Sequence, residues 1–384
     1  MKVSQVCVSS RLEPHHCQAL SAIAPDLVLV FGAHRRLLQP DLLGVLTRAL
    51  PAAELVGCST AGEISQQGVT DDHLVLTALT FEHPGVRVAT TDLADLTDSR
   101  AAGQRLGRSL ARDHLHHVLV LAQGVAINGS ALIEGLYDTL SASVQISGGL
   151  AADGGAFSGT LTLSRAGVSA HQIVAVGFDS PRLKISHGCF HGWKPFGPAR
   201  KVTRSVGNWL YELDGQPALQ LYRRYLGEHS RGLPASGLLF PFEMLGGDFI
   251  GHGLIRTILG MDEASGGLLL AGDIDPKGFL RLMHANADAL VEGAEAAAEA
   301  TLDDLKGTGD VLSLLVSCVG RKLVMGERVE EEVEAVAAVH GGRDKIAGFY
   351  SNGEIGPARF GRPCELHNQT MTITRFEEVA ADAV

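Results

Sequence analysis

The sequence is poor in cysteine and in aromatic residues. It has six cysteines among 384 residues and no Cys-x-x-Cys pair, which excludes a disulfide framework. Aromatic residues make up 5% of the chain, and much of the 45% hydrophobic fraction is Ala, Leu and Val. Cys7, Cys58 and Cys318 lie in or beside apolar strand patterns, so we expect buried thiols in a reduced cytoplasm.

The chain also lacks excess positive charge, long apolar runs and a leader pattern. Its net charge of −11 argues against a nucleic-acid surface and leaves no polybasic patch for a membrane. No apolar run approaches the ~18 to 20 residues of a membrane span. Residues 1–10 have one Lys and no long apolar core, so no signal peptide is expected. We therefore expect a cytoplasmic protein without nucleic-acid partners or membrane insertion.

Several motifs of well-known enzymes are missing. The sequence has no P-loop, no Gly-x-Gly-x-x-Gly fingerprint in its glycine-rich segments and no Gly-x-Ser-x-Gly nucleophile turn at Ser59. These absences argue against a nucleotide site and against the common serine hydrolases.

Two stretches of the same form are present, one in the N-terminal third and one near the C-terminus. Residues 57–64 read Gly-Cys-Ser-Thr-Ala-Gly-Glu-Ile, and residues 348–355 read Gly-Phe-Tyr-Ser-Asn-Gly-Glu-Ile. Each follows apolar residues typical of a buried strand. A strand that runs into two glycines brings its backbone close to a neighbour, because glycine has no Cβ.

The surroundings of the two stretches repeat as well. Residues 27–32 match 314–320 as a strand, and a helical pattern, the glycine strand and an alternating strand ending in Phe-Glu follow each. The unit strand, helix, glycine strand, strand therefore occurs twice, which predicts an internal duplication. A third, weaker echo begins at His117 and reaches a strand that runs into Gly148 and Gly149. The alternative is that unrelated βαβ units resemble one another.

Length and pattern together predict the fold class. A chain of this length is too long for one ordinary core, so we expect two domains, 1–226 and 227–384, divided at the Gly-, Pro- and Ser-rich stretch 227–241. Continuous apolar strands favour buried, partly parallel sheets, and alternating strands favour antiparallel edges. We expect an α/β protein of two related domains of mixed β-sheets flanked by helices, with the strand-helix-strand-strand duplication.

Two glutamates and an aspartate are the first candidates for chemistry. Glu63 and Glu354 form a carboxylate pair across a pseudo-twofold axis if the duplication is symmetric, which suits acid–base work or an amino-group ligand. The alternative is that each accepts backbone N–H bonds at its own turn. Gly148, Gly149 and Asp153 either cradle an anion in backbone N–H groups or form a tight turn that lines a pocket.

Three further residues have ligand chemistry. His187, Cys189 and His191 lie in a stretch, 187–198, whose Gly and Pro content predicts a loop. Their types and spacing suit a metal or a haem axial bond, and nearby aromatic residues offer packing for a porphyrin face. With 16 His in the chain, a chance cluster on a plain surface loop is the competing interpretation.

With these motifs in view, the chain resembles the FIST family, the F-box and intracellular signal transduction proteins, over almost its whole length. The resemblance rests on residues 56–64 and 148–154 of an N-terminal domain and on 348–357 and 365–370 of a C-terminal domain. It implies small-ligand sensing rather than catalysis. One branch resembles stand-alone, nitric-oxide-sensing haem proteins that regulate a histidine kinase or a cyclic-di-GMP enzyme. This chain has FIST segments, almost nothing else and no apparent F-box, so it is similar to the stand-alone type.

We therefore expect a sensor, not an enzyme, that binds a small-molecule ligand between its two domains and signals to a histidine kinase or a cyclic-di-GMP enzyme. Haem is a candidate cofactor, with nitric oxide as the sensed gas. The alternative is a hydrolase or transferase that uses Cys58 or Ser59 with Glu63. The glycine-rich strand ends of both domains, with Asp153, should face one shared cleft. The expected ligand-binding residues are Cys58, Ser59, Thr60, Gly62, Glu63, Gly148, Gly149, Asp153, Tyr350, Ser351, Asn352 and Glu354.

Overall fold

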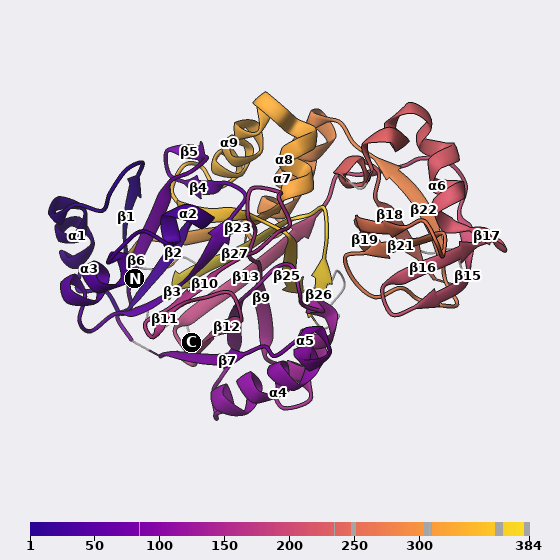
Figure 1. The fold of residues 1–384 in the computed structure, drawn as a ribbon. Helices are drawn as coiled ribbons and strands as arrows, with labels where there is room; N and C mark the ends of the chain where they lie inside the picture. The colour runs from indigo at the N-terminus through magenta and orange to yellow at the C-terminus, as the bar shows by residue number, and fades with distance from the viewer. Residues whose placement is uncertain are drawn as a thin grey trace.

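The computed structural model describes residues 1–83, 85–233, 235–246, 251–302, 307, 309–357 and 364–379. The chain forms a large body of three six-stranded sheets and a smaller domain that contains a nine-stranded sheet (Figure 1). No helix in these ranges is both long and apolar enough to cross a membrane.

The body consists of three units with the same order of strands. The first unit has β1 (Lys2–Val8), α1 (Pro14–Ser21), β2 (Leu27–Ala33), α2 (His34–Leu37), α3 (Leu42–Ala49), β3 (Glu54–Thr60), β4 (Glu63–Ser65), β5 (Gly68–Thr70) and β6 (Leu74–Thr80). The second has β7 (Val86–Asp92), α4 (Ser99–Leu110), β8 (His117–Ala122), α5 (Gly129–Tyr137), β9 (Gln145–Leu150), β10 (Thr162–Ser164), β11 (Gly167–Ser169) and β12 (Gln172–Phe178). The third has β13 (Leu183–Phe190), α7 (Ala287–Glu299), β23 (Leu312–Cys318), α8 (Val319–Met325), α9 (Glu330–Val339), β24 (Lys345–Ser351), β25 (Gly353–Pro357), β26 (Cys364–His367) and β27 (Met371–Glu378).

The smaller domain is an insertion between β13 and α7 of the third unit. It has β14 (Lys194–Pro195), β15 (Arg200–Val206), β16 (Trp209–Leu213), β17 (Gln216–Pro217), α6 (Ala218–Leu226), β18 (Phe242–Leu245), β19 (Gly251–Arg256), β20 (Ile258–Asp262), β21 (Gly267–Leu270) and β22 (Phe279–His284). Its core packs α6 against these strands, separate from the cores of the body. Figure 1 shows it beside the body, beyond β26.

Each sheet of the body is completed by a hairpin from another unit. The first sheet runs β1-β6-β2-β3 and ends in β10-β11 of the second unit. The second runs β7-β12-β8-β9 and ends in β25-β26 of the third, and the third runs β13-β27-β23-β24 and ends in β4-β5 of the first. In every case the two central strands are parallel and the added hairpin pairs antiparallel with the glycine strand. The three units therefore exchange hairpins in a cycle.

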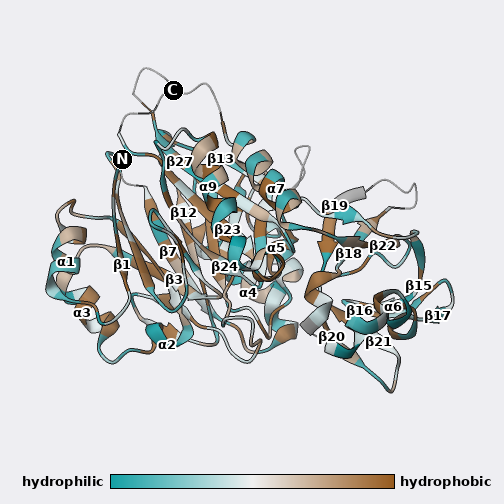
Figure 2. Cartoon of the chain, turned by 90° about the horizontal axis from the view of Figure 1, so that it is seen from above, coloured by the Kyte–Doolittle hydropathy of each residue, from teal (hydrophilic) through white to brown (hydrophobic). Residues whose placement is uncertain are grey.

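The three sheets surround one shared core. Phe31 and Val56 of the first sheet, Phe178 of the second, and Phe349 and Phe376 of the third all belong to it. Figure 2 shows that most strands of the body are hydrophobic, as expected for sheets covered on both faces. The outer faces are covered by helices, and Asn128 and Asn286 cap α5 and α7 by accepting a hydrogen bond from a backbone N–H of the first turn.

The predicted fold class is confirmed, and the duplication extends further than predicted. The protein is an α/β structure with mixed sheets flanked by helices, and both copies of the repeated unit are present. The weak echo at His117 is a full third copy with the same strand order and the same hairpin exchange.

The sheets do not follow the predicted division between residues 226 and 227. The nine-stranded sheet joins β15 and β16 to β18–β22, on the other side of that division. In the body, β13 pairs with β27, and β4 pairs with β24. The insertion after β13 and the hairpin exchange together interleave the two halves of the chain.

The first glycine of each motif has the same close contact with a neighbouring strand, so the same substitution can be tested at equivalent positions. Gly57, Gly148 and Gly348 lie opposite Val30, Val120 and Leu315, and a Cβ at each would lie 1.9 Å from that residue's carbonyl oxygen. We expect Gly57→Ala and Gly348→Ala each to lower the free energy of unfolding by about 2 to 3 kcal/mol, because backbone must move to admit the methyl group.

Urea unfolding of the purified variants measures this loss. Gly167→Ala is the matched control, since a Cβ there meets no atom within 4 Å. If Gly57→Ala and Gly348→Ala are as stable as the control, the close approach of the strands does not constrain these positions.

Candidate functional site

The three glycine-rich strand ends meet at the centre of the body, as the shared-cleft prediction requires, but they are packed together. The ends are joined in a ring by backbone hydrogen bonds, from Ala61 N to Tyr350 O (2.9 Å), from Ala152 N to Ser59 O (2.8 Å) and from Asn352 N to Leu150 O (3.1 Å). Gly149 is buried in this ring, where a Cβ would lie 2.7 Å from Val316 and 3.2 Å from Phe349. The strand ends therefore form a closed junction, because neighbouring backbone and core side chains fill the space between them.

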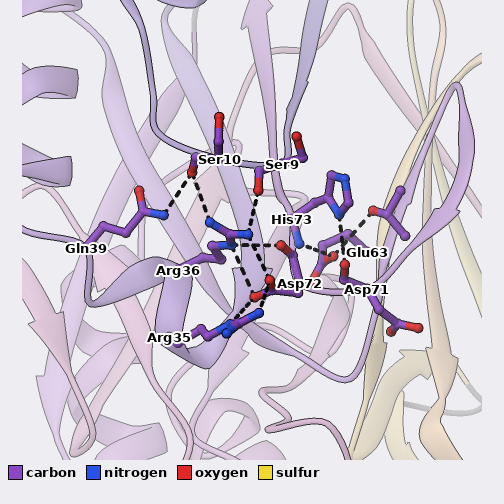
Figure 3. A network of polar contacts seen from close by, with 10 residues as sticks. Ser9, Ser10, Arg35, Arg36, Gln39, Glu63, Asp71, Asp72 and His73 are labelled. Carbon is purple, nitrogen blue, oxygen red and sulfur yellow. Dashed lines mark hydrogen bonds and ion pairs between the residues drawn. The ribbon is translucent and has the colours of Figure 1, made fainter.

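Glu63 is held by its own turn. Its carboxylate accepts hydrogen bonds from Thr60 Oγ1 (2.5 Å) and from the backbone N–H of His73 (3.0 Å). Figure 3 shows the neighbouring loop, in which Asp72 is clamped by the guanidinium groups of Arg35 and Arg36. Burial raises the pKa of Glu63, although these hydrogen bonds oppose the shift.

Glu354 repeats this arrangement in the third unit. Ser351 Oγ donates to its carboxylate (2.6 Å), as do the backbone N–H (3.1 Å) and the hydroxyl (3.0 Å) of Thr370. Complete burial raises the pKa of Glu354 to about 7, against the three hydrogen bonds, which lower it. Both glutamates follow the second interpretation, in which each carboxylate accepts hydrogen bonds at its own turn.

Asp153 organises a turn of the second unit. Its carboxylate accepts backbone hydrogen bonds from Phe157 (2.8 Å), Ser158 (2.7 Å) and Gly159 (3.0 Å). Burial alone would raise the pKa of Asp153, but these hydrogen bonds outweigh it and lower the pKa. Gly148 lies within β9, which pairs with β8 and β25, so the tight turn describes this segment better than an anion cradle.

The other predicted residues of the two motifs are also engaged within the fold. Cys58 is fully buried in the shared core, and burial raises the pKa of its thiol well above the ordinary value. Ser59 Oγ donates to Ala152 O (2.7 Å) and accepts from Leu161 N (2.9 Å). Tyr350 is buried and donates its hydroxyl to Glu332 (2.7 Å). Within the described residues, neither Cys58 nor Ser59 bonds to Glu63, so the geometry gives the enzyme alternative no nucleophile–base pair.

The predicted loop with haem-ligand chemistry is corrected by the structure. His187 and Cys189 lie on β13, which pairs with β27 along its whole length. The His187 ring stacks on His117 at 5.1 Å between centroids, its Nε2 lies 3.0 Å from Gln145 Oε1, and burial lowers its pKa to about 4. Cys189 Sγ accepts a bond from Thr372 Oγ1 (3.7 Å).

The residues around this segment do not fit a haem. His191 Nδ1 accepts a hydrogen bond from Trp193 N (3.0 Å), and Trp193 is itself buried against Leu290 and Met325. Phe196 is exposed and packs edge-on against His284. No group of three His, Cys, Asp or Glu side chains suited to a metal ion occurs among the residues that the structure describes. His187 and Cys189 thus lie within a paired strand and are engaged by neighbouring side chains, an arrangement that does not suit axial ligation of a haem.

Two cavities lie instead where the body meets the smaller domain. The larger has a volume of about 570 Å³ and lies between α4, α5 and β26 of the body and β19 of the smaller domain. The smaller has a volume of about 230 Å³ and lies beside it, and Leu366 of β26 lines both. Pockets of a few hundred Å³ between domains are the usual setting of small-molecule sites.

The larger cavity is lined by a buried arginine without a carboxylate partner. Arg256 is 4% exposed, and its guanidinium donates only to backbone oxygens, those of Asp273 (3.0 Å), Ile255 (3.2 Å) and Leu366 (3.1 Å). In the described part of the chain it forms no ion pair within 4 Å. Burial lowers its pKa to about 10, and the charges of Glu365 and Asp273 partly oppose this. A buried cation of this kind is costly unless an anion reaches it.

Residues 365–370, which begin in β26 at the wall of the larger cavity, include several buried polar atoms without hydrogen-bond partners among the described residues. Glu365, which also lines the larger cavity, has a buried Oε2 with no hydrogen bond among the described residues. The same holds for His367 Nδ1, Gln369 Oε1 and both amide atoms of Asn368. Buried polar atoms in proteins are normally paired, so such a cluster marks a place where water or a ligand is bound.

The ligand-binding residues predicted from the sequence therefore lie mostly outside these cavities. Of the predicted ligand residues, Asn352 lines the smaller cavity, and the other eleven line neither. The sequence-based prediction did not include Arg256 or Glu365. The signals were present, since Arg256 is a lone charge in the apolar run 254–258 and Glu365 opens one of the motifs that carry the family resemblance.

The raised pKa of Glu354 predicts a specific pH dependence of stability. The unfolded carboxyl titrates near 4.5 and the folded one at about 7. The protonated form is thus favoured by folding, and its contribution is complete below pH 4.5 and is lost as pH rises through 7. Between pH 5 and pH 8 we expect the free energy of unfolding to fall by about 2 kcal/mol more for the parent than for Glu354→Gln.

Urea unfolding at several pH values gives the two profiles. Glu295→Gln, on the exposed face of α7, is the control and should follow the parent. Parallel profiles for the parent and Glu354→Gln would show that the three hydrogen bonds keep Glu354 ionised.

Comparisons with known proteins agree with the motifs of the sequence. A FIST N domain matches residues 26–216 and a FIST C domain matches residues 218–357. An uncharacterized protein of Methanocaldococcus jannaschii, MJ1623, is 33% identical over 89 residues, which are 23% of this chain and 17% of that protein.

Two solved structures of cyanuric acid hydrolase align with nearly the whole chain, but weakly. The enzyme from A. caulinodans aligns with a TM-score of 0.36 at 10% identity, covering 99% of both chains. A second cyanuric acid hydrolase gives a TM-score of 0.33 at 12% identity, covering 98% of this chain and 99% of that one. Likeness at this level supports no conclusion about activity. The two matching domains cover most of the sequence, and the chain belongs to the FIST family.

Proposed function

We propose that this protein is a small-ligand sensor whose ligand binds in the larger cavity between the body and the smaller domain. FIST domains are small-ligand sensing domains, which sets the general role. The observation that supports the location is the pair of unpaired charges in one cavity, the buried Arg256 guanidinium and Glu365. A ligand that supplies partners to both would offset the cost of burying them.

The cavity restricts the ligand chemistry. Arg256 would bind a carboxylate, a phosphate or another strong hydrogen-bond acceptor, because a guanidinium can only donate hydrogen bonds. Glu365 calls for a hydrogen-bond donor or a cationic group. Part of the cavity wall is apolar and is formed by Leu254, Ile133 and Leu366. The proposed ligand is therefore a small organic molecule that carries an acceptor beside a donor, and haem is not part of the proposal because the residues around His187 do not fit it.

The position of the cavity suggests how binding is transmitted. Its walls come from α5 and β26 of the body and from β19 of the smaller domain, so a ligand that contacts both changes how the two pack. Such a change can be read by a partner protein. In keeping with the resemblance to stand-alone sensors, the proposed partner is a cytoplasmic histidine kinase or cyclic-di-GMP enzyme. Catalysis by Cys58 or Ser59 with Glu63 is the second candidate function, and among the described residues neither Cys58 nor Ser59 bonds to Glu63.

A cavity-blocking variant tests the location. Ala142 is exposed at the wall of the larger cavity, so Ala142→Trp should fill it without disturbing the core. We expect acidic and zwitterionic metabolites from a screening panel to raise the melting temperature of the parent protein. For the compounds confirmed in this way, Ala142→Trp should weaken binding, measured by calorimetry, at least tenfold. Glu365→Gln should weaken compounds with a cationic group and spare purely anionic ones.

Ala111→Trp is the matched control, because Ala111 is exposed at the end of α4 and does not line the cavity. Binding that is equal in the parent and in both tryptophan variants would place the ligand elsewhere. A panel in which no charged compound binds would remove the support for this cavity.

A further inference from the structure

The smaller of the two cavities differs from the larger in its chemistry. It lies between the segment 124–129, β9 and Phe157 on the body side and β16, β20 and β21 of the smaller domain. Its walls are mainly apolar, from Ile127, Leu150, Phe157, Trp209, Leu269 and Leu366. No charged side chain is among the described residues that line it. A ligand for this space is therefore uncharged.

The rim of this cavity exposes aliphatic side chains. Leu96 is 46% exposed, Val125 39% and Leu259 36%, and all three line the cavity. They are three of the eight large hydrophobic residues that the described chain leaves exposed. The first two come from the body and the third from the smaller domain, so the exposed apolar surface gathers on both sides of one opening. Apolar surface grouped around a hollow is a mark of a binding site.

Asn352 brings a buried polar atom without a hydrogen-bond partner among the described residues to the wall. The Asn352 side chain donates from Nδ2 to Gly124 O (3.2 Å), and because a carbonyl only accepts, this contact fixes the orientation of the amide. Asn352 Oδ1 is then the free acceptor, and it is buried with no hydrogen bond from the described residues. The nearby amide of Asn128 is already used, by Ala131 N and Asp273. Asn352 Oδ1 is therefore a buried acceptor, free to receive a hydrogen bond, in a mainly apolar surround.

We propose that this cavity is a second ligand site, for an uncharged molecule of one or two rings that carries one hydrogen-bond donor. The volume of about 230 Å³ sets the size, since an apolar cavity of roughly 150 Å³ is enough to hold benzene. The donor pairs with Asn352 Oδ1, and the ring fills the space between Trp209, Leu269 and Phe157. The site does not depend on Arg256 or Glu365, so it stands apart from the larger cavity.

Phenol and toluene test the proposal, because they share size and shape and differ in the hydroxyl donor. Calorimetry should show saturable binding of both, with phenol about fivefold tighter, the gain expected for one hydrogen bond to an otherwise unpaired acceptor. Trp209 lines the cavity and Trp193 is buried elsewhere, so tryptophan fluorescence gives a second readout. In Asn352→Leu the preference for phenol should disappear while toluene still binds.

Three variants locate the probe. Val125→Phe narrows the opening and should weaken both compounds at least tenfold, whereas Leu38→Phe, at another exposed leucine outside the cavity, should change neither. Ala142→Trp fills the larger cavity and should leave phenol binding unchanged. Absence of saturable binding, equal binding to Val125→Phe, or a phenol preference that persists in Asn352→Leu would each overturn the proposal. Loss of phenol binding in Ala142→Trp alone would assign the probe to the larger cavity and also overturn it.

Discussion

The exchange of hairpins among the three units is the constraint on which the rest of the structure depends. No sheet of the body is complete without two short strands from another unit, so each unit covers an edge that would otherwise expose unpaired backbone groups. The exchange also brings the three glycine strand ends together, where they bond to one another in a ring. The glycines are required because the strands at this junction approach too closely for a side chain.

A buried ion pair ties this junction to the helices around it. Arg321 and Glu332 are both fully buried and lie 2.7 Å apart, and Glu332 also accepts hydrogen bonds from Ser317 and from Tyr350 of the third glycine strand. Arg321 donates further to the carbonyl of Leu290 on α7. A pair like this adds little net stability, but removing one partner would leave a buried charge. The pair links α8 to α9, and Arg321 also bonds to α7.

The fold was largely predictable from the sequence because its signals are local. Continuous apolar runs, capping residues such as Asn128 and the Gly-Glu-Ile motifs identify strands, helices and repeats without knowledge of their partners. Hairpin exchange is a long-range pairing, and neither Glu63–Ser65 nor Gly353–Pro357 carries a local sign that its partner strand belongs to another unit. The prediction of a loop around His187 was wrong for a related reason. The glycines of this stretch favour a loop, but long-range pairing with β27 makes it a strand.

The candidate site was less predictable because it arises from the insertion. The repeated glutamates are polar residues in apolar strands, a pattern that favours ligand residues, yet each accepts hydrogen bonds from its own unit. Arg256 and Glu365 lie far apart in the sequence and line one cavity because the smaller domain packs against β26. Among the described residues, the hairpin β25-β26 lines both cavities and the equivalent hairpins β4-β5 and β10-β11 line neither, so the symmetry of the body is broken there.

The order of the exchange has a consequence for synthesis on the ribosome. The first sheet needs only β10-β11, so it can close once the second unit has been made. The second sheet must wait for β25-β26 and the third for β23, β24 and β27, while β4-β5 has been finished long before its partner strand exists. The nascent chain therefore carries open strand edges until its last segment emerges, and pairings of this range are slow and prone to aggregation. Shielding by chaperones during elongation would matter more for this protein than for a chain whose repeats each close on themselves.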